Sequence, residues 1–308
     1  MMKNLLILTI CMIIILLIFI FFVYYFTFKL TKKRISKTDS NTIKKVSNLC
    51  KTKYPFLLLH GMGMRDFYYF NYWGYIPTEL IKNGATIYYG KQDALGCIEH
   101  NSIVIKKRIL EIISTEKCEK VNIIAHSKGG LEARYVISQL GIANHIASLT
   151  TISTPHRGSC FADFVIDKVP YPIFQTICRF INKVYIKMGD IQPDVYTTAH
   201  QLTTTYAHFF NANNINDRNV YYQSYATVMK HGFHHPLLLI PYIIISKKEK
   251  CNDGLVTLSS AQWGHFQKVF MNESLGTSHT DIIALTKNDS EITNIYIEII
   301  KDLKKLGY

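Results

Sequence analysis

The stretch VNIIAHSKGG, residues 121–130, places a serine where its hydroxyl could act as a nucleophile. Val121 to Ala125 has the length and β-branched content of a buried strand, and the residues after the serine suit a helix. Ser127 is therefore expected on a strand-to-helix turn. In such a turn the residues two before and two after the serine must be small, because the strained backbone passes close to its neighbours. Those positions hold Ala125 and Gly129.

A serine hydroxyl needs a histidine to accept its proton and a carboxylate to orient that histidine. After Ser127 the strongest acid candidate is Asp253, in the tight turn Asn252-Asp253-Gly254 that follows the apolar run 237–245. The same three residues could equally form an ordinary turn. The histidine is open, because the chain has twelve. Both His265 and His279 follow Asp253 along the chain.

The elements that must position these residues alternate along residues 54–308. Strands are expected at 56–59, 85–89, 121–125, 148–152 and 268–270, and helices at 76–82, at 103–113, after Ser127 and near the C-terminus. Alternation of strand and helix implies an α/β fold with a mostly parallel sheet that is covered on both sides by helices.

Four blocks of sequence together carry a family resemblance. They are LLLHGMG at 57–63, AHSKGG at 125–130, TISTPHRGS at 151–159 and NDGLVTLSSAQWG at 252–264. In this order they resemble the bacterial triacylglycerol lipases of the α/β-hydrolase superfamily, of a membrane-anchored Gram-positive type. The resemblance implies the α/β-hydrolase fold and a triad in the order serine, acid, histidine. It assigns these roles to Ser127, Asp253 and His279, the last within a similar H-x-D signature.

The resemblance also implies how the remaining parts of the site are made. The oxyanion would be bound by the backbone N–H groups of Met62 and Lys128, the residues that follow the His60-Gly61 pair and the nucleophile. Asp281 matches a calcium-binding aspartate in part of the family, with Asp217 as a loose candidate for its partner. A structural calcium would follow from that match, but the chemistry itself requires no cofactor.

A helical segment rich in apolar residues follows the TPHRGS block. Residues 160–188 include Phe161, Phe164, Ile173, Phe174, Phe180 and Ile181. The resemblance implies a mobile lid, within a cap at about 160–215, whose apolar face meets lipid. The alternative is two ordinary helices that face the core.

The N-terminus predicts attachment to a membrane. Leu5 to Phe28 is a run of 24 residues without a charge, and a helix of about 20 residues crosses the bilayer core. The apolar core of a cleaved signal peptide is shorter, so residues 1–28 are predicted to be an uncleaved single-pass anchor. Residues 29–53 form a basic linker, with nine Lys or Arg against Asp39. Basic residues after the span favour a catalytic domain on the cytoplasmic side. The lipases that this chain resembles are exported, and for this reason the catalytic domain is expected, by a small margin, on the outer face.

These features predict a serine hydrolase, with residues 54–308 as its catalytic domain. It would cleave carboxylic esters of acyl lipids through an acyl-enzyme on Ser127. Because most of the excess positive charge lies in residues 1–53, next to the predicted span, the basic composition does not indicate nucleic-acid binding. Two alternatives remain open: an esterase, thioesterase or acyltransferase for smaller acyl groups, and a catalytically inactive, membrane-tethered binding module.

Overall fold

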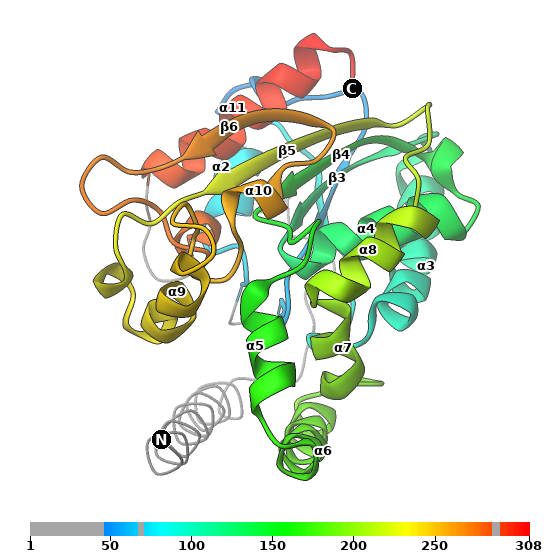
Figure 1. Ribbon diagram of the computed structural model, residues 1–308. Coiled ribbons are helices and arrows are strands. Elements are labelled where there is room, and N and C mark those ends of the chain that lie inside the picture. Colours follow the sequence, from blue (N-terminus) through cyan, green and yellow to red (C-terminus); the bar gives the residue numbers. More distant parts are fainter. Residues whose placement is uncertain (1–45, 67–70, 285–289) are drawn as a thin grey trace.

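A six-stranded sheet organises the computed structural model, which describes residues 46–66, 71–284 and 290–308 (Figure 1). The strand order is β2-β1-β3-β4-β5-β6, and every neighbouring pair is parallel. The strands are β1 (Phe56–Leu59), β2 (Ile87–Tyr89), β3 (Val121–His126), β4 (Ile146–Ile152), β5 (Tyr221–Thr227) and β6 (His265–Phe270). The prediction of a mostly parallel sheet is confirmed. All carboxyl ends of the strands therefore meet at one edge, where catalytic loops of such folds gather.

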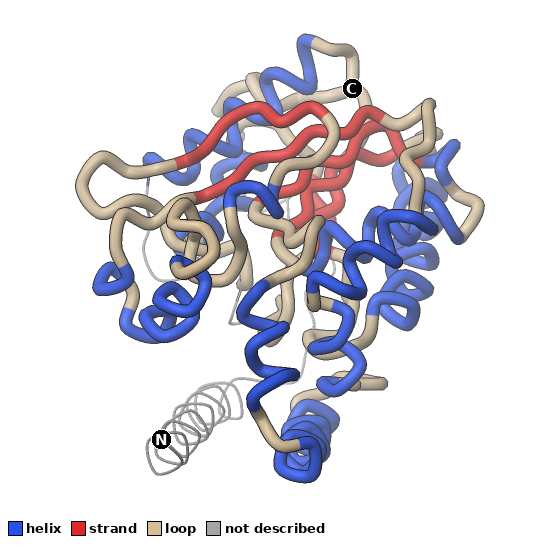
Figure 2. The backbone as a smooth tube through the Cα atoms, in the orientation of Figure 1, coloured by secondary structure: helices blue, strands red, loops and turns tan. Residues whose placement is uncertain are grey.

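Helices cover both faces of the sheet (Figure 2). The alternating side chains of β1 pack against both helical layers. Phe56 and Leu58 pack with residues of α2 (Ile76–Lys82) and α11 (Ser290–Lys305). Leu57 and Leu59 point to the opposite face and pack with residues of α3 (Ile98–Glu116) and α4 (Lys128–Gln139). Burial on both sides explains why β1 is the continuous apolar run FLLL.

Strand β5 is absent from the sequence-based prediction. Its sequence, YYQSYAT, contains polar residues that break an apolar run, yet all but the first of its residues are buried. Neighbouring elements satisfy the polar side chains: Gln223 Nε2 donates to Thr150 Oγ1 at 2.9 Å, and Ser224 Oγ donates to the Trp263 carbonyl at 2.7 Å. These partners come from elsewhere in the chain, so a local pattern could not identify them.

The long connection between β4 and β5 is helical. It contains α5 (Cys160–Lys168), α6 (Tyr171–Lys187), α7 (Val195–Gln201) and α8 (Thr204–Asn213). Figure 1 shows α5, α6 and α7 extending away from the sheet. A role for this segment as a lid or cap stays a prediction.

A second group of helices follows β5. It comprises the short 3₁₀ turns η2 (Gly232–His234) and η3 (Pro236–Leu238) and the helix α9 (Leu239–Ser246), which takes up the apolar run noted in the sequence. The remaining short elements are η1 (Ala143–His145), α10 (Leu258–Ala261) and η4 (Asp281–Ile283).

The predicted anchor, Leu5 to Phe28, and most of the basic linker lie outside the described residues. In the described ranges, which begin at residue 46, no helix is both long and apolar enough to span a bilayer. Among the described residues, the cysteines at 50, 97, 118, 160, 178 and 251 are free.

Candidate active site

Ser127 lies on the turn between β3 and α4 and has a strained backbone. Its φ of 53° and ψ of −130° are unusual for a residue with a side chain. Its N–H donates to the Ile152 carbonyl at 3.0 Å, which ties the turn to the end of β4. A Cβ atom on Gly129 would lie 2.6 Å from the His60 carbonyl oxygen, so only glycine fits there. The turn therefore holds the serine side chain at the carboxyl edge of the sheet.

Asp253 and His279 form a buried pair at the same edge. Asp253 Oδ2 and His279 Nδ1 are 2.9 Å apart, and the His279 N–H donates to the Asp253 carbonyl at 2.9 Å. Asp253 Oδ1 accepts from the N–H groups of Leu255 and Val256 at 3.0 and 2.8 Å. Burial raises the pKa of Asp253, but His279 and these hydrogen bonds outweigh burial and leave the pKa below its ordinary value. The carboxylate therefore stays charged and fixes the tautomer of the imidazole.

The rings of His126 and Tyr72 place His279 next to the serine turn. His126 immediately precedes Ser127, and its ring centroid lies 4.6 Å from that of His279. His126 Nδ1 lies 2.6 Å from Tyr72 Oη. Burial, and next the neighbouring His279, lower the pKa of His126 well below 6.5, while burial raises the pKa of Tyr72. Tyr72 is therefore the donor, and a neutral His126 packs against His279.

His265, the other histidine that follows Asp253, lies elsewhere. It begins β6, is exposed, and stacks on Tyr221 at the start of β5 with centroids 5.2 Å apart. Because the strands are parallel, their starts lie at the edge opposite Ser127. His279, and not His265, is the histidine in contact with Asp253.

Thr227 is a residue of the site that the sequence analysis did not identify. It ends β5, and its hydroxyl donates to Asp253 Oδ2 at 3.0 Å. The Ser153 hydroxyl lies 2.7 Å from Thr227 Oγ1 and completes a chain of hydrogen bonds to the carboxylate. Both residues lie at the carboxyl ends of strands. This position is the one feature of the sequence from which they could have been predicted. Detecting Thr227 required the strand β5, which local patterns miss.

The predicted oxyanion donors flank the serine turn. A Cβ atom on Gly61 would lie 2.8 Å from Ser127 Cβ, so the loop that carries Met62 passes directly beside the nucleophile. Lys128 is the first residue of α4, where backbone N–H groups lack helical acceptors. Within the described residues, neither the Met62 nor the Lys128 N–H has a hydrogen-bond acceptor. Both donors are thus available to an anion at Ser127.

The side chain of Lys128 has a structural role that the sequence did not predict. It is buried, and its ammonium pairs with Glu132 one turn along α4 and donates to the Gly96 carbonyl at 2.8 Å. Asn101 Nδ2 also donates to Glu132 Oε1, at 2.7 Å. Burial raises the pKa of Glu132, while Lys128 acts in the opposite direction. The pair holds the start of α4, and hence the Lys128 N–H, against the loop before α3.

The calcium ligands expected from the sequence do not come together. Asp281 Oδ2 lies 2.9 Å from His234 Nε2 and accepts from the Ser278 N–H at 2.9 Å. Asp217 precedes β5, at the opposite edge of the sheet from Asp281, which follows β6. The described ranges contain no cluster of three or more His, Cys, Asp or Glu side chains able to hold a metal. Asp217 therefore does not complete a site with Asp281, and a structural calcium stays a prediction.

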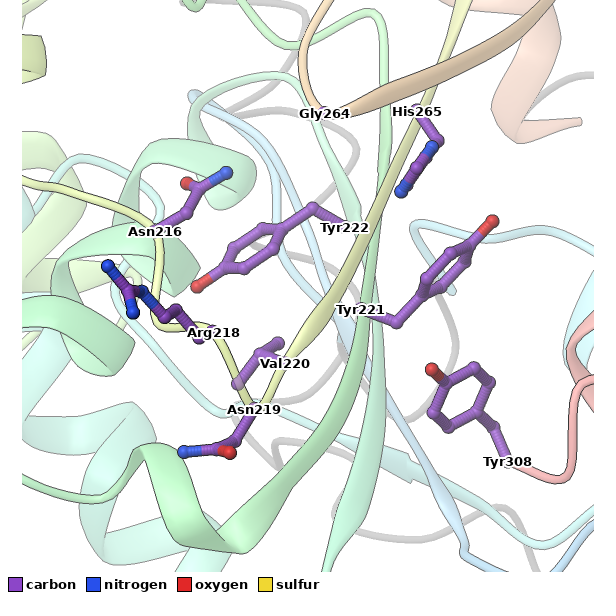
Figure 3. Close-up of a pocket in the computed structure, with 9 residues that line it drawn as sticks. All are labelled: Asn216, Arg218, Asn219, Val220, Tyr221, Tyr222, Gly264, His265 and Tyr308. Atoms are coloured by element: carbon purple, nitrogen blue, oxygen red, sulfur yellow. The ribbon is translucent and has the colours of Figure 1, made fainter.

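A cavity of about 280 Å³ lies away from this site (Figure 3). Figure 3 shows the rings of His265, Tyr221 and Tyr308 on one side of β5 and Arg218 and Asn216 on the other. These residues belong to the starts of β5 and β6, the segment before β5, and the C-terminus. The cavity is thus at the edge of the sheet opposite Ser127 and is separate from the candidate active site.

Comparisons with known proteins agree with this architecture. A family model described as palmitoyl protein thioesterase matches residues 55–230. Triacylglycerol lipase 2 of Saccharomyces cerevisiae is 31% identical over 260 residues, which cover 77% of this chain and 74% of the yeast protein. A triacylglycerol lipase of Pseudarthrobacter phenanthrenivorans is 33% identical over 175 residues, 53% of this chain and 54% of that protein. The chain therefore spans about half the length of this bacterial relative.

A solved structure supports the fold. The mature form of the Bacillus licheniformis lipase BlEst2 matches with a TM-score of 0.62 at 18% identity, over 82% of this chain and 92% of that one. The family model covers more than half of the chain, and the yeast lipase matches across most of its own length. The chain therefore belongs to the palmitoyl protein thioesterase family and is a triacylglycerol lipase-like α/β-hydrolase.

Proposed function

We propose that this protein is a serine hydrolase that cleaves carboxylic esters of acyl lipids through an acyl-enzyme on Ser127. The observation that carries the proposal is the buried Asp253–His279 pair beside the strained Ser127 turn. With Nδ1–H donated to Asp253, His279 Nε2 is free to take the proton of the serine hydroxyl. The relatives named triacylglycerol lipase support an acyl-lipid ester as the substrate.

The reaction follows from these positions. Ser127 Oγ attacks the ester carbonyl while His279 takes its proton, and the N–H groups of Met62 and Lys128 bind the resulting oxyanion. His279 then returns the proton to the leaving alcohol, and the acyl group stays on Ser127. Water, activated by the same histidine, attacks the acyl-enzyme and releases the fatty acid. Side chains and backbone N–H groups supply every step, so the mechanism calls for no metal.

The decisive experiment separates an enzyme from an inactive binding module. A fluorophosphonate should label the full-length protein, and Ser127→Ala should abolish the label without unfolding the chain. Hydrolysis should then be measured across oxygen esters of increasing acyl length. Failure of the wild-type protein to label and to hydrolyse any of these esters would reject the proposal.

A thioesterase is the second candidate, and the match to the palmitoyl protein thioesterase family favours it. Thioesters and oxygen esters pass through the same acyl-enzyme and differ in the leaving group. The comparison to make is kcat/KM for an S-palmitoyl peptide against a palmitoyl oxygen ester of matched length. A strong preference for the thioester would replace the lipase assignment while leaving the roles of the three residues unchanged.

We further propose that residues 5–28 anchor the protein in a membrane, with the hydrolase on the outer face. Burial of 24 uncharged residues far outweighs electrostatic attachment by the linker, so the protein should remain in membranes after a high-salt wash. Protease treatment of intact cells tests the side. Digestion of residues 54–308 without lysis supports the outer face, full protection reverses it, and a soluble protein lacking residues 1–28 rejects the anchor.

A further inference from the structure

The segment after β5 carries an exposed apolar cluster that neither the fold nor the reaction requires. Phe233 is 82% exposed, Leu237 53% and Ile243 50%. They lie on η2, η3 and α9, and Figure 1 shows α9 standing out from the sheet. Single exposed apolar residues are ordinary on a protein surface, whereas a cluster of them marks an interaction site.

The segments that carry these side chains pack on each other. A Cβ atom on Gly232 would lie 2.8 Å from Leu239 Cδ1 and 2.9 Å from Tyr242 Cδ1, which places η2 directly against α9. The loop after β6 joins it, since the Leu275 carbonyl accepts from Lys230 N–H and His234 Nδ1 at 3.0 Å each, and Leu275 is itself exposed. We call this the α9 surface, formed by Phe233, Leu237, Ile243 and Leu275.

Basic residues border the α9 surface. Residues 230–250 contain four lysines, all exposed, against the acid Glu249, and the loop that carries Leu275 adds the exposed acid Glu273, whose carbonyl accepts from Lys230 Nζ. Glu249 is already engaged, because Oε1 accepts from the Ser259 N–H at 2.9 Å and Oε2 from the Ser259 hydroxyl. Lysines are depleted at the cores of protein interfaces but are typical at the borders of segments that lie in a membrane surface. The charge is therefore complementary to anionic lipid headgroups.

The α9 surface is also connected to both candidate catalytic loops. His234 pairs with Asp281. His235 Nε2 lies 3.2 Å from the hydroxyl of Thr280, the residue that directly follows His279. Gly254, which directly follows Asp253, lies against η3: a Cβ atom on Gly254 would be 2.9 Å from Leu238 Cβ. A ligand of the α9 surface would therefore sit close to the site.

We propose that the α9 surface docks on the bilayer and inserts its apolar side chains among anionic lipids. The lysines at 230, 247, 248 and 250 contact the headgroups, and Phe233 and Leu237 reach the acyl chains. This contact does not involve α6, and it brings the catalytic loops to the lipid surface. The proposal concerns position and not turnover, so it does not rest on the ester hydrolysis proposed above.

Fluorescence quenching tests the proposal on the full-length protein in vesicles. Phe233→Trp places a reporter at the tip, and acyl-chain-brominated phosphatidylcholine quenches a tryptophan only when it enters the bilayer. Ile215→Trp is the matched control, because Ile215 is 75% exposed and precedes β5 at the opposite edge of the sheet. The signals of Trp73 and Trp263 are common to both variants. Cosedimentation with the vesicles and fluorophosphonate labelling verify that each variant is bound and folded.

The expected result is quenching at position 233 and none at position 215, stronger in vesicles that contain phosphatidylglycerol than in neutral ones. Lys247→Glu combined with Lys248→Glu should remove that extra quenching and leave hydrolysis of a soluble short-chain ester unchanged. Equal quenching at 233 and 215 would overturn the proposal. So would blue-shifted, unquenched emission at 233, which would mean that residues 1–45 or a second copy of the chain cover the surface. Quenching that is independent of anionic lipid would overturn the role of the lysines.

Discussion

At the scale of single residues, the carboxylate of Asp253 is held by four donors. Two backbone N–H groups bind Oδ1, while the Thr227 hydroxyl and His279 bind Oδ2. A carboxylate with both oxygens engaged cannot rotate away from the imidazole. It is therefore ready to stabilise the imidazolium that forms when Ser127 attacks.

The first prediction concerns the three proposed catalytic residues. Ser127→Ala, Asp253→Asn and His279→Ala should each lower kcat by about a thousandfold or more, and combining them should add little, because they act as a unit. His265→Ala is the control and should retain activity, because this exposed ring lies at the opposite edge of the sheet. If His265→Ala abolishes turnover while His279→Ala does not, the assignment is wrong.

A second prediction concerns Thr227 as a positioning residue. Thr227→Val keeps the shape of the side chain but removes its hydrogen bond to the charged Asp253, a bond of about 1.5–3 kcal/mol. We expect kcat to fall about tenfold or more, with KM unchanged. Thr227→Ser restores the hydroxyl and should restore kcat. If valine and serine variants lose equal activity, packing and not the hydrogen bond explains the effect.

At the scale of elements, α6 carries apolar side chains on two faces. Phe174, Cys178, Ile181 and Tyr185 are buried, and Tyr185 Oη donates to the Gly63 carbonyl at 2.6 Å, next to Met62. Away from this buried face, Ile173 and Phe180 are exposed on one side of the helix, seven residues apart. One face thus has the ordinary core role that the sequence left open, and the other is available to lipid. The two faces can be tested separately.

The third prediction uses a matched pair on α6. Phe180→Glu places a charge on the exposed face and should lower hydrolysis of emulsified long-chain esters, while a soluble short-chain ester and the thermal midpoint are unaffected. Phe174→Glu buries a charge against Tyr196 and His200 and should lower the midpoint and both activities. Equal loss on both substrates in Phe180→Glu would show that the exposed face has no lid function.

At the scale of the whole molecule, three histidines are buried without charge. Burial is the largest cause that lowers the pKa of His60, His126 and His156, to about 3 for His60 and well below 6.5 for the other two. Below pH 6.5, each of these rings is protonated in the unfolded chain but remains neutral in the folded protein until the pH reaches its lower folded pKa. The unfolded state therefore takes up more protons below pH 6.5.

The fourth prediction follows from the sign of these shifts. The stability contributed by the three neutral rings is complete above the unfolded pKa of 6.5 and is lost as the pH falls from there toward the folded values. The urea midpoint should thus decrease steadily below pH 6.5. His156→Gln, which removes the ring that stacks on Trp263, should reduce that slope when compared with wild type. A midpoint independent of pH between 6.5 and 4 would contradict this account.

The sequence by itself determined the parts of this protein that depend on neighbouring residues. The bounds of β1 and α2 and the sheet class follow from hydrophobic periodicity, and the turn at Ser127 follows from small residues at fixed spacing. Steric limits on a backbone act over a few residues, so a short pattern is sufficient to predict them. The anchor and linker stay predictions, because they lie outside the described residues.

Only the tertiary structure decided which distant groups meet. The family resemblance assigned Asp253 and His279 to one triad, and the structure brings them into contact across 26 residues. Thr227 reaches the same carboxylate from the end of a strand that local patterns miss. The fold also places Asp217 and Asp281 at opposite edges of the sheet. It pairs the Lys128 ammonium with Glu132. Hydrogen bonds and ion pairs depend on distances in space. Those distances arise from how strands pair and helices pack across the whole chain, which no local spacing specifies.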